Sequence, residues 1–264
     1  MSQTVLVHKD DGCWTVTLDR PEKRNALSAQ MVQDLTEVIE QARAQSAAQS
    51  AAQSQRQGTD HDLGQAAAQA PRLLVLQGSG KNFSAGFDFS DWEQITEAEL
   101  LWRFVHIEQL LQLLQSLPIL TVALAHGKNF GAGVDLMAAC KHRVADVDST
   151  FRMPGFKFGL VLGTRRLARL VGAQRAQDIQ QVAHTLSATE AQQAGLVSDV
   201  VGVGQWPEVM AQQQAVSMAL TPGARAQLYR VLHVDTDDED MADLVRSVTE
   251  PGLKSRIAKY LADG

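Results

Sequence analysis

The chain has 264 residues, with 24 lysines and arginines against 30 aspartates and glutamates, which gives a formal net charge of −6. This acidic balance disfavours nucleic-acid binding, because such binding requires a concentrated positive field. Apolar residues make up 45% of the chain and charged residues 20%. That composition is typical of a globular protein and excludes disorder of the whole chain.

The chain contains two cysteines, Cys13 and Cys140, which lie far apart and outside any C-x-x-C motif. This pattern predicts neither a structural zinc site nor a disulfide framework. The first residues, MSQTVLVHKDDG, carry acids where a signal peptide needs a basic start and an unbroken apolar run. The longest apolar stretch, at 119–125, is shorter than the ~20 residues that span a bilayer. We therefore expect a cytoplasmic protein without a membrane segment.

Two short strands and a helix are predicted near the N-terminus. Residues 4–7 and 14–18 are rich in β-branched side chains and flank the turn-forming HKDDG, which predicts a hairpin. Ser28 is a suitable N-cap for a helix over 29–45, where apolar residues recur at helical spacing.

Residues 43–70 differ in composition from the rest of the chain. The segment contains AAQS twice in succession and has few side chains that a core could bury. Its alanines and glutamines favour a helical extension and a flexible loop equally, so both interpretations stay open.

The middle of the chain alternates between buried strands and helices. Residues 72–78 and 119–125 are apolar runs that predict strands covered on both faces. A helix is predicted over 97–116, and another over 131–143, directly after a glycine-rich turn. This order predicts a parallel sheet joined by right-handed crossovers.

From residue 200 onward the pattern is mainly helical, with an acidic turn, DTDDED, between two of the segments. The predicted organisation is a core over 1–199, which includes the insertion at 43–70, and a helical region over 200–264.

Two loops place glycine where a buried strand ends and a helix begins. They are FSAGFDF at 83–89 and HGKNFGAGVD at 126–135. Backbone N–H groups at such a position can bind an anion or a developing oxyanion. Glycines at these turns are also common packing devices, which is the alternative interpretation.

Five blocks in the chain resemble the enoyl-CoA hydratase/isomerase, or crotonase, family. They are LDRPEKRNALS, NFSAGFDF, AHGKNFGAGVDLMAAC, FKFGLVLGTRRLARLVG and LSATEAQQAGLVSDVV, in the family's order. The resemblance implies an α/β fold, a spiral of repeated ββα units, with a C-terminal helical region that forms a homotrimer or a dimer of trimers. It also implies an acyl-CoA substrate, so that coenzyme A belongs to the substrate and no further cofactor or metal is expected.

The resemblance places the oxyanion hole on the backbone N–H groups of Phe87 and Ala132, where a thioester enolate would be stabilised. Ala132 stands where the family usually has glycine. Asp135 falls at the position of an acid/base carboxylate, as in the dienoyl-CoA isomerase branch. The alternative for Asp135 is an acid that complements the dipole of the first helical turn.

The family's second glutamate falls on Gly155, which cannot hold or activate water. Hydration needs one group to take a proton from water and another to deliver one to carbon, so this position disfavours an ordinary hydratase. His106, twelve residues before Pro118, matches an active-site histidine of the 4-chlorobenzoyl-CoA dehalogenase branch and is a second catalytic candidate. A histidine packed on a helix is the alternative.

The resemblance also predicts residues that contact the CoA and acyl parts of the substrate. They are Arg24, Ala26, Ala85, Asp88, Phe89 and Tyr260, the last with a possible role at a neighbouring subunit's site. Arg165, Arg166 and Arg169 are interpreted as surface or trimer contacts.

The combined prediction is an enzyme that stabilises a thioester enolate and isomerises an enoyl-CoA double bond, with Asp135 as the proton shuttle. One alternative is an enoyl-CoA hydratase with a replaced second acid. Thioester hydrolysis or decarboxylation, which depend more on the oxyanion hole, is another. The third is an acyl-CoA-binding protein without turnover.

Overall fold

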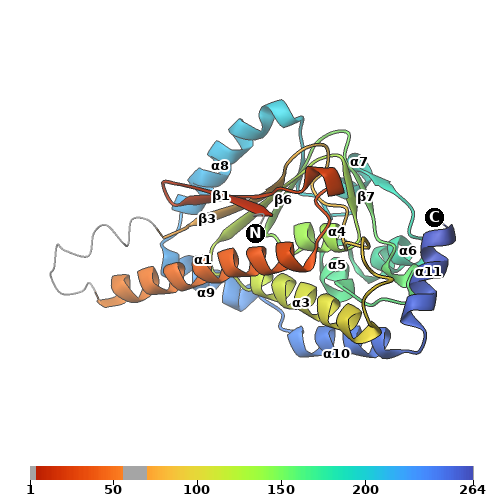
Figure 1. Cartoon of the computed structure of the whole chain (residues 1–264). Helices are drawn as coiled ribbons and strands as arrows, with labels where there is room; N and C mark the ends of the chain where they lie inside the picture. Colours follow the sequence, from red (N-terminus) through yellow and green to blue (C-terminus); the bar gives the residue numbers. More distant parts are fainter. Residues whose placement is uncertain (1–3, 56–69, 264) are drawn as a thin grey trace.

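A computed structural model describes residues 4–55 and 70–263, in which a sheet is covered by helices on both faces (Figure 1). The larger sheet has six strands, in the spatial order β1 (Val5–Asp10), β2 (Cys13–Leu18), β3 (Leu73–Gly78), β4 (Leu120–Ala125), β6 (His142–Ala145) and β9 (Asp199–Val200). The β1–β2 pair is antiparallel, as the predicted hairpin requires, and the other pairs are parallel.

A smaller sheet lies beside the first. It comprises β5 (Lys128–Phe130), β7 (Thr150–Arg152) and β8 (Leu186–Ser187). β5 pairs parallel with β7, and β8 pairs antiparallel with β7. Its first strand, β5, directly follows β4 along the chain, so β5 leads from the large sheet to the turn before α4.

The helices and 3-10 turns follow the order of the chain. They are η1 (Pro21–Lys23), α1 (Ala29–Gln55), α3 (Glu97–Gln115), α4 (Ala132–Ala138), η2 (Gly155–Phe158), α5 (Thr164–Val171), α6 (Ala173–Val182), α7 (Ala188–Gln193), η3 (Val203–Gln205), α8 (Trp206–Met218), α9 (Pro222–Leu232), α10 (Asp237–Thr249) and α11 (Leu253–Asp263). Among the described helices none is both long and apolar enough to cross a membrane.

Successive residues of β3 point to opposite faces of the sheet, and both faces are buried. Leu74 and Leu76 belong to the main core, which the helices α1 and α3 cover. Leu73 and Val75 belong to a smaller cluster with Val209 of α8 on the other face. The strand is therefore covered on both sides, as its continuous apolar run predicts.

Helix α1 continues through the first part of the low-complexity segment. It runs to Gln55, so the helical extension is correct up to that residue, and residues 56–69 lie outside the described part of the chain. The extension is not solvated all round, because Ser46 and Gln49 are buried and α1 contacts α9. Small and polar side chains thus allow two helices to approach here.

Two of the predicted helix boundaries are wrong. The helix expected over 131–143 ends at Ala138, because His142–Ala145 pairs with β4 as a strand. The acidic segment expected as a turn instead begins α10 at Asp237. Four acids in this first turn complement the positive end of the helix dipole.

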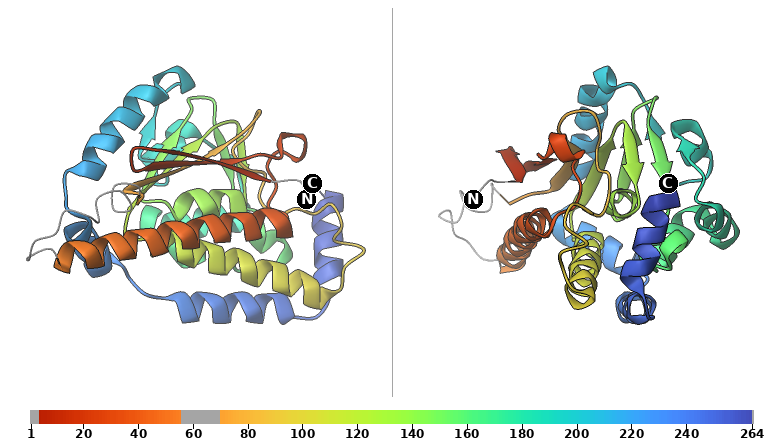
Figure 2. Two further views of the ribbon diagram at one scale, coloured as in Figure 1. Left: turned by 60° about the vertical axis from the view of Figure 1, so that its left-hand side comes forward. Right: turned by 45° about the vertical axis from the view of Figure 1, so that its right-hand side comes forward.

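The C-terminal helices α10 and α11 pack against elements that come earlier in the chain. α10 packs on α3, and α11 packs on η2. The views in Figure 2 place α11 at the opposite end of the molecule from α8 and α9. This arrangement brings the end of the chain to the cavity described next.

Candidate active site

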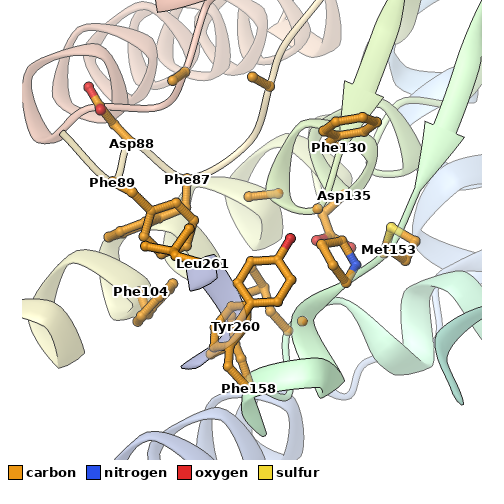
Figure 3. A pocket seen from close by; sticks show the side chains of 18 of the residues that line it. Phe87, Asp88, Phe89, Phe104, Phe130, Asp135, Met153, Phe158, Tyr260 and Leu261 are labelled. Carbon is orange, nitrogen blue, oxygen red and sulfur yellow. The ribbon is translucent and has the colours of Figure 1, made fainter. Parts of the chain in front are cut away.

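A cavity of about 600 Å³ lies between the 83–89 loop, the turn before α4, η2 and the C-terminal helix (Figure 3). It is lined by Glu22, Lys23, Arg24, Ala26, Ala85, Phe87, Asp88, Phe89, Ser90, Phe104, Phe130, Gly131, Ala132, Asp135, Met153, Pro154, Gly155, Phe156, Phe158, Leu160, Leu162, Gln180, Tyr260 and Leu261. Every predicted site residue except His106 is in this lining.

Gly86 brings the two predicted oxyanion donors together. It has φ +83°, and a Cβ there would lie 2.3 Å from Phe130 O and 3.2 Å from Ala132 N. Only glycine accepts both that conformation and that close approach. The backbone of the residue before Phe87 is thus in contact with the start of α4.

Both N–H groups are available for a ligand in the described chain. Around Phe87, Gly86 O and the N–H of Asp88 are each bonded to the backbone of Leu27, and no acceptor among the described residues bonds the N–H of Phe87. Ala132 is the first residue of α4, and its N–H lies outside the helical ladder. The φ of Ala132 is not positive, so alanine fits where the family usually has glycine.

Asp135 is buried, with 2% of its surface exposed, and no described group donates a hydrogen bond to its Oδ1. Burial raises the pKa of Asp135 well above that of an ordinary aspartate; the positive charge of Arg166 opposes this effect and the negative charge of Glu108 adds to it. A raised pKa makes the ionised carboxylate a stronger base, so the same group can take a proton and return it.

Gly163 forms the surface against which the Asp135 carboxyl lies. It has φ +64° and caps the N-terminus of α5, and a Cβ at Gly163 would stand 2.0 Å from Asp135 Oδ1. Any side chain at this position would therefore displace the carboxyl.

A buried ion pair lies behind Asp135. Arg166 Nη2 is 3.0 Å from Glu108 Oε1, and both side chains are almost fully buried. Arg166 Nε also donates to Gln115 Oε1 at 2.6 Å. The pair joins α5 to α3 and supplies the two charges that act on Asp135.

The interpretation of the arginine cluster as surface or trimer contacts is therefore wrong for Arg166. Arg165 pairs with Asp240 and Asp243 of α10, which also joins helices within one subunit. Sequence spacing could not show this, because the acidic partners lie 58 to 78 residues away along the chain.

Aromatic rings form one wall of the cavity (Figure 3). Phe87 stacks on Phe104 with ring centroids 4.4 Å apart and meets Phe89 edge-on at 4.8 Å. Phe158 follows, 6.1 Å from Phe89 and 5.2 Å from Tyr260. This wall is apolar and suits a hydrocarbon or ring-bearing group. Tyr260 reaches the cavity of its own subunit, from α11.

The mouth of the cavity carries charge. Arg24 is exposed, and no described carboxylate pairs with it. Its carbonyl oxygen accepts the N–H of Ala85 at 2.9 Å, which joins the two predicted CoA-contacting loops. The mouth therefore offers a free cation where a phosphate could bind.

Asp88 is engaged within its own loop. Arg20 Nη1 lies 2.8 Å from its carboxylate and also donates to the carbonyl oxygen of Ala26. Burial alone would raise the pKa of Asp88, but hydrogen bonds from Ser90 and Arg20 outweigh burial and lower it. Asp88 is thus ionised and paired, and it shapes the loop rather than offering a free base.

The structure does not bring His106 to the other predicted residues. It lies on α3, where its ring is 4.5 Å from that of the exposed Trp102, and it is not part of the cavity lining. Residue spacing along a helix left its direction open, and packing places the half-buried ring beside Trp102, outside the cavity.

Gln180 is a lining residue that sequence reasoning missed. It is buried on α6 beside Ile179 and one turn after the buried Ala176. A glutamine at a buried position of a helix was the available signal.

Possible metal ligands gather elsewhere in the described chain. One ligand atom from each of His233, Asp235 and Asp237 lies within 4.8 Å of the others, where the connection after α9 enters the first turn of α10. None of these residues lines the cavity.

Fold and site together define an α/β protein of the crotonase fold, with unpaired backbone donors near a buried carboxyl. Residues 61–245 match the model of the enoyl-CoA hydratase/isomerase family, and the chain belongs to this family of enzymes.

Known relatives are similar over most of the chain. A crystal structure described as an enoyl-CoA hydratase/isomerase from Bordetella parapertussis is 46% identical, with a TM-score of 0.88 and 99% of each chain covered. An enoyl-CoA isomerase/hydratase of Mycosarcoma maydis is 28% identical over 268 residues, which cover 96% of this chain and 89% of that one. A protein named as an enoyl-CoA hydratase in Mycobacterium bovis is 32% identical, over 84% of this chain and 79% of its own.

Proposed function

We propose that the chain is an enoyl-CoA isomerase in which Asp135 carries a proton between two carbons of the acyl group. One observation carries this proposal. The cavity lining contains three carboxyl residues, of which Glu22 is exposed and Asp88 is paired with Arg20. Asp135 is the buried one with an unpaired oxygen.

The proposed reaction converts a 3-enoyl into a 2-enoyl thioester. The Asp135 carboxylate takes a proton from C2, and the electron pair of the broken C–H bond spreads through the chain to the thioester oxygen. The N–H groups of Phe87 and Ala132 stabilise that oxygen, a contribution of about 2.7–4 kcal/mol for each donor. The Asp135 carboxyl then returns the proton to C4, and the thioester carbonyl re-forms.

This reaction needs one acid/base group, whereas hydration needs two. Gly155, at the position of the family's second glutamate, lines the cavity without a side chain. Hydration is the second candidate, because a 32% identical relative is named as a hydratase. It would require another group to activate water.

The substrate's coenzyme A would enter past Arg24, whose free guanidinium suits the phosphates. Tyr260 and the backbone of Ala26 and Ala85 would then border the CoA chain. Coenzyme A is part of the substrate in this proposal, and no separate cofactor or metal takes part.

We also infer a cytoplasmic homotrimer, alone or as a dimer of trimers. The support is a group of exposed apolar side chains on and after α8 and α9, which are Val216, Met218, Leu220, Leu228, Val231, Leu232 and Val234. Exposed apolar groups of this size typically mark contacts between chains.

Incubation in heavy water with 2-enoyl-, 3-enoyl-, dienoyl- and saturated acyl-CoA tests the reaction. We expect 3-enoyl-CoA to become 2-enoyl-CoA, with deuterium incorporated to the extent that the Asp135 proton exchanges. Water addition would establish the hydratase instead, and binding without exchange would leave a protein without turnover.

Asp135→Asn tests the residue that carries the proton. Asparagine keeps the shape but cannot accept a proton, so we expect turnover to fall by at least about a thousandfold while the Kd for acyl-CoA stays within about threefold. Asp178→Asn, on the exposed surface of α6, is the matched control. Equal activity in Asp135→Asn would remove Asp135 from the mechanism.

A further inference from the structure

Gln180 is an unusual component of the cavity. The lining has three buried polar side chains, Asp88, Asp135 and Gln180. Asp88 is satisfied by Arg20 and Ser90, and Asp135 is the proposed proton carrier. Gln180 has 6% of its surface exposed and no part in the proposed isomerisation.

The Gln180 amide is only partly satisfied. Its Nε2 donates to Thr164 Oγ1 at 3.4 Å, which is long for a hydrogen bond. This is the one hydrogen bond of the Gln180 side chain in the described chain, and its Oε1 is not among the fully buried atoms without a partner, so the oxygen is open to the cavity. An amide left without partners beneath an apolar ligand lowers the affinity for that ligand. A ligand that covers the amide must therefore offer it a hydrogen-bonding group.

The amide also lies on the side of the cavity where the proposed chemistry takes place. Its partner Thr164 directly follows Gly163, the residue against which the Asp135 carboxyl lies. A ligand group that reached Gln180 would thus lie on the same side of the cavity as Asp135. Because a further negative charge near Asp135 would oppose the ionised carboxylate that the reaction needs, a neutral oxygen suits the position better than a carboxylate.

We propose that Gln180, positioned by its hydrogen bond to Thr164, forms a polar subsite that selects acyl groups with a hydroxyl or carbonyl oxygen over plain hydrocarbon chains. The inference rests on the proposed function to the extent that an acyl-CoA occupies this cavity. A site built to bond an oxygen discriminates strongly against the analogue that lacks it, because the amide is then covered and unpaired. The aromatic wall binds the rest of the acyl group, and the Gln180 amide forms a hydrogen bond with the oxygen of the substituent.

Binding of matched saturated thioesters tests the subsite without any turnover. The pairs are 4-oxopentanoyl-CoA with 4-methylpentanoyl-CoA, and 5-oxohexanoyl-CoA with 5-methylhexanoyl-CoA. Within each pair a carbonyl oxygen replaces a methyl group of similar size. By calorimetry, we expect the full-length protein to bind the oxo member of at least one pair about tenfold more tightly.

Gln180→Leu should reverse this preference, because leucine has a similar size and no hydrogen-bonding group. Its neighbour Gln181 is exposed on the same helix, so Gln181→Leu is the matched control and should keep the preference. Thr164→Val is a second variant, which should weaken the preference for the oxo member without abolishing binding.

Two results would overturn the subsite. One is equal affinity of the full-length protein for both members of both pairs. The other is an oxo preference that Gln180→Leu leaves unchanged. Failure to bind any of the four thioesters is a different result, because it contradicts the proposed function itself.

Discussion

Gly163 determines where the Asp135 carboxyl can lie. Gly163→Ala would add a Cβ 2.0 Å from Asp135 Oδ1, at a residue with φ +64°. We expect turnover to fall about a hundredfold, since displacement of a catalytic group by about 1 Å has that effect. The positive φ should lower the free energy of unfolding by about 1–2 kcal/mol. Steady-state kinetics and urea unfolding measure the two effects.

Gly12→Ala is the control for backbone strain. Gly12 lies in the β1–β2 turn and has φ +73°. A Cβ there would make one ordinary contact, 3.7 Å from Ala70 O. This variant should lose stability and keep its turnover number. A similar loss of turnover in both variants would show that strain, and not collision with Asp135, is responsible.

The raised pKa of Asp135 predicts the pH dependence of catalysis. Proton abstraction needs the ionised carboxylate, so kcat/KM should rise with pH through the pKa of Asp135 and then level off. Because burial raises that pKa, the rising limb should lie above the range of an ordinary aspartate, about 3.9. A limb at the ordinary value would contradict the role of Asp135 as base.

Glu108→Gln tests the charge behind the carboxyl. Removal of a negative charge near Asp135 stabilises the Asp135 carboxylate, so the rising part of the kcat/KM profile should move to lower pH. The exposed Glu239 provides the control, Glu239→Gln, with no shift expected. Circular dichroism must accompany the profiles, because the change also leaves Arg166 without its buried partner.

At the scale of elements, α11 closes the cavity through Tyr260 and Leu261. Arg256 holds this helix, with Nη1 bonded to Phe158 O and Nη2 to Ser247 O and Glu250 O. Arg256→Ala should lower the free energy of unfolding by about 1.5–3 kcal/mol. It should also raise KM roughly threefold to tenfold, because α11 would cover the cavity in a smaller fraction of the protein molecules and only these bind substrate well.

Arg246→Ala provides the comparison for Arg256→Ala. Its side chain is 72% exposed on α10, and its loss should change neither KM nor stability measurably. An unchanged KM in Arg256→Ala, with the expected loss of stability, would exclude α11 from substrate binding.

For the whole molecule, the exposed apolar residues of α9 predict the assembly. Val231 and Leu232 are 66% and 69% exposed, and their helix α9 lies at the end of the molecule opposite α11 (Figure 2). Burying an unpaired charge between subunits is unfavourable, so Val231→Asp should shift the sedimentation coefficient from that of a trimer to that of a monomer. Val182→Asp, at a residue 63% exposed on α6, should leave the assembly intact. A wild-type monomer would contradict the inferred trimer.

Short-range patterns in the chain predicted much of the fold. Apolar runs predicted β3 and β4, and glycine-rich turns predicted the start of α4. The predicted helix over 131–143 was too long because the mixed segment after Ala138, ACKHRVA, suits a helix and a strand alike. Pairing with β4 decided between them.

The order of the blocks in the sequence determined the family, the two glycine-rich loops and the position of Asp135 beside them, because these depend on neighbouring residues. Only the tertiary structure decided that Arg166 is buried against Glu108, that His106 faces away from the cavity and that Gln180 faces into it. A polar side chain is buried or exposed according to groups distant in the sequence that pack around it, and no local pattern contains them.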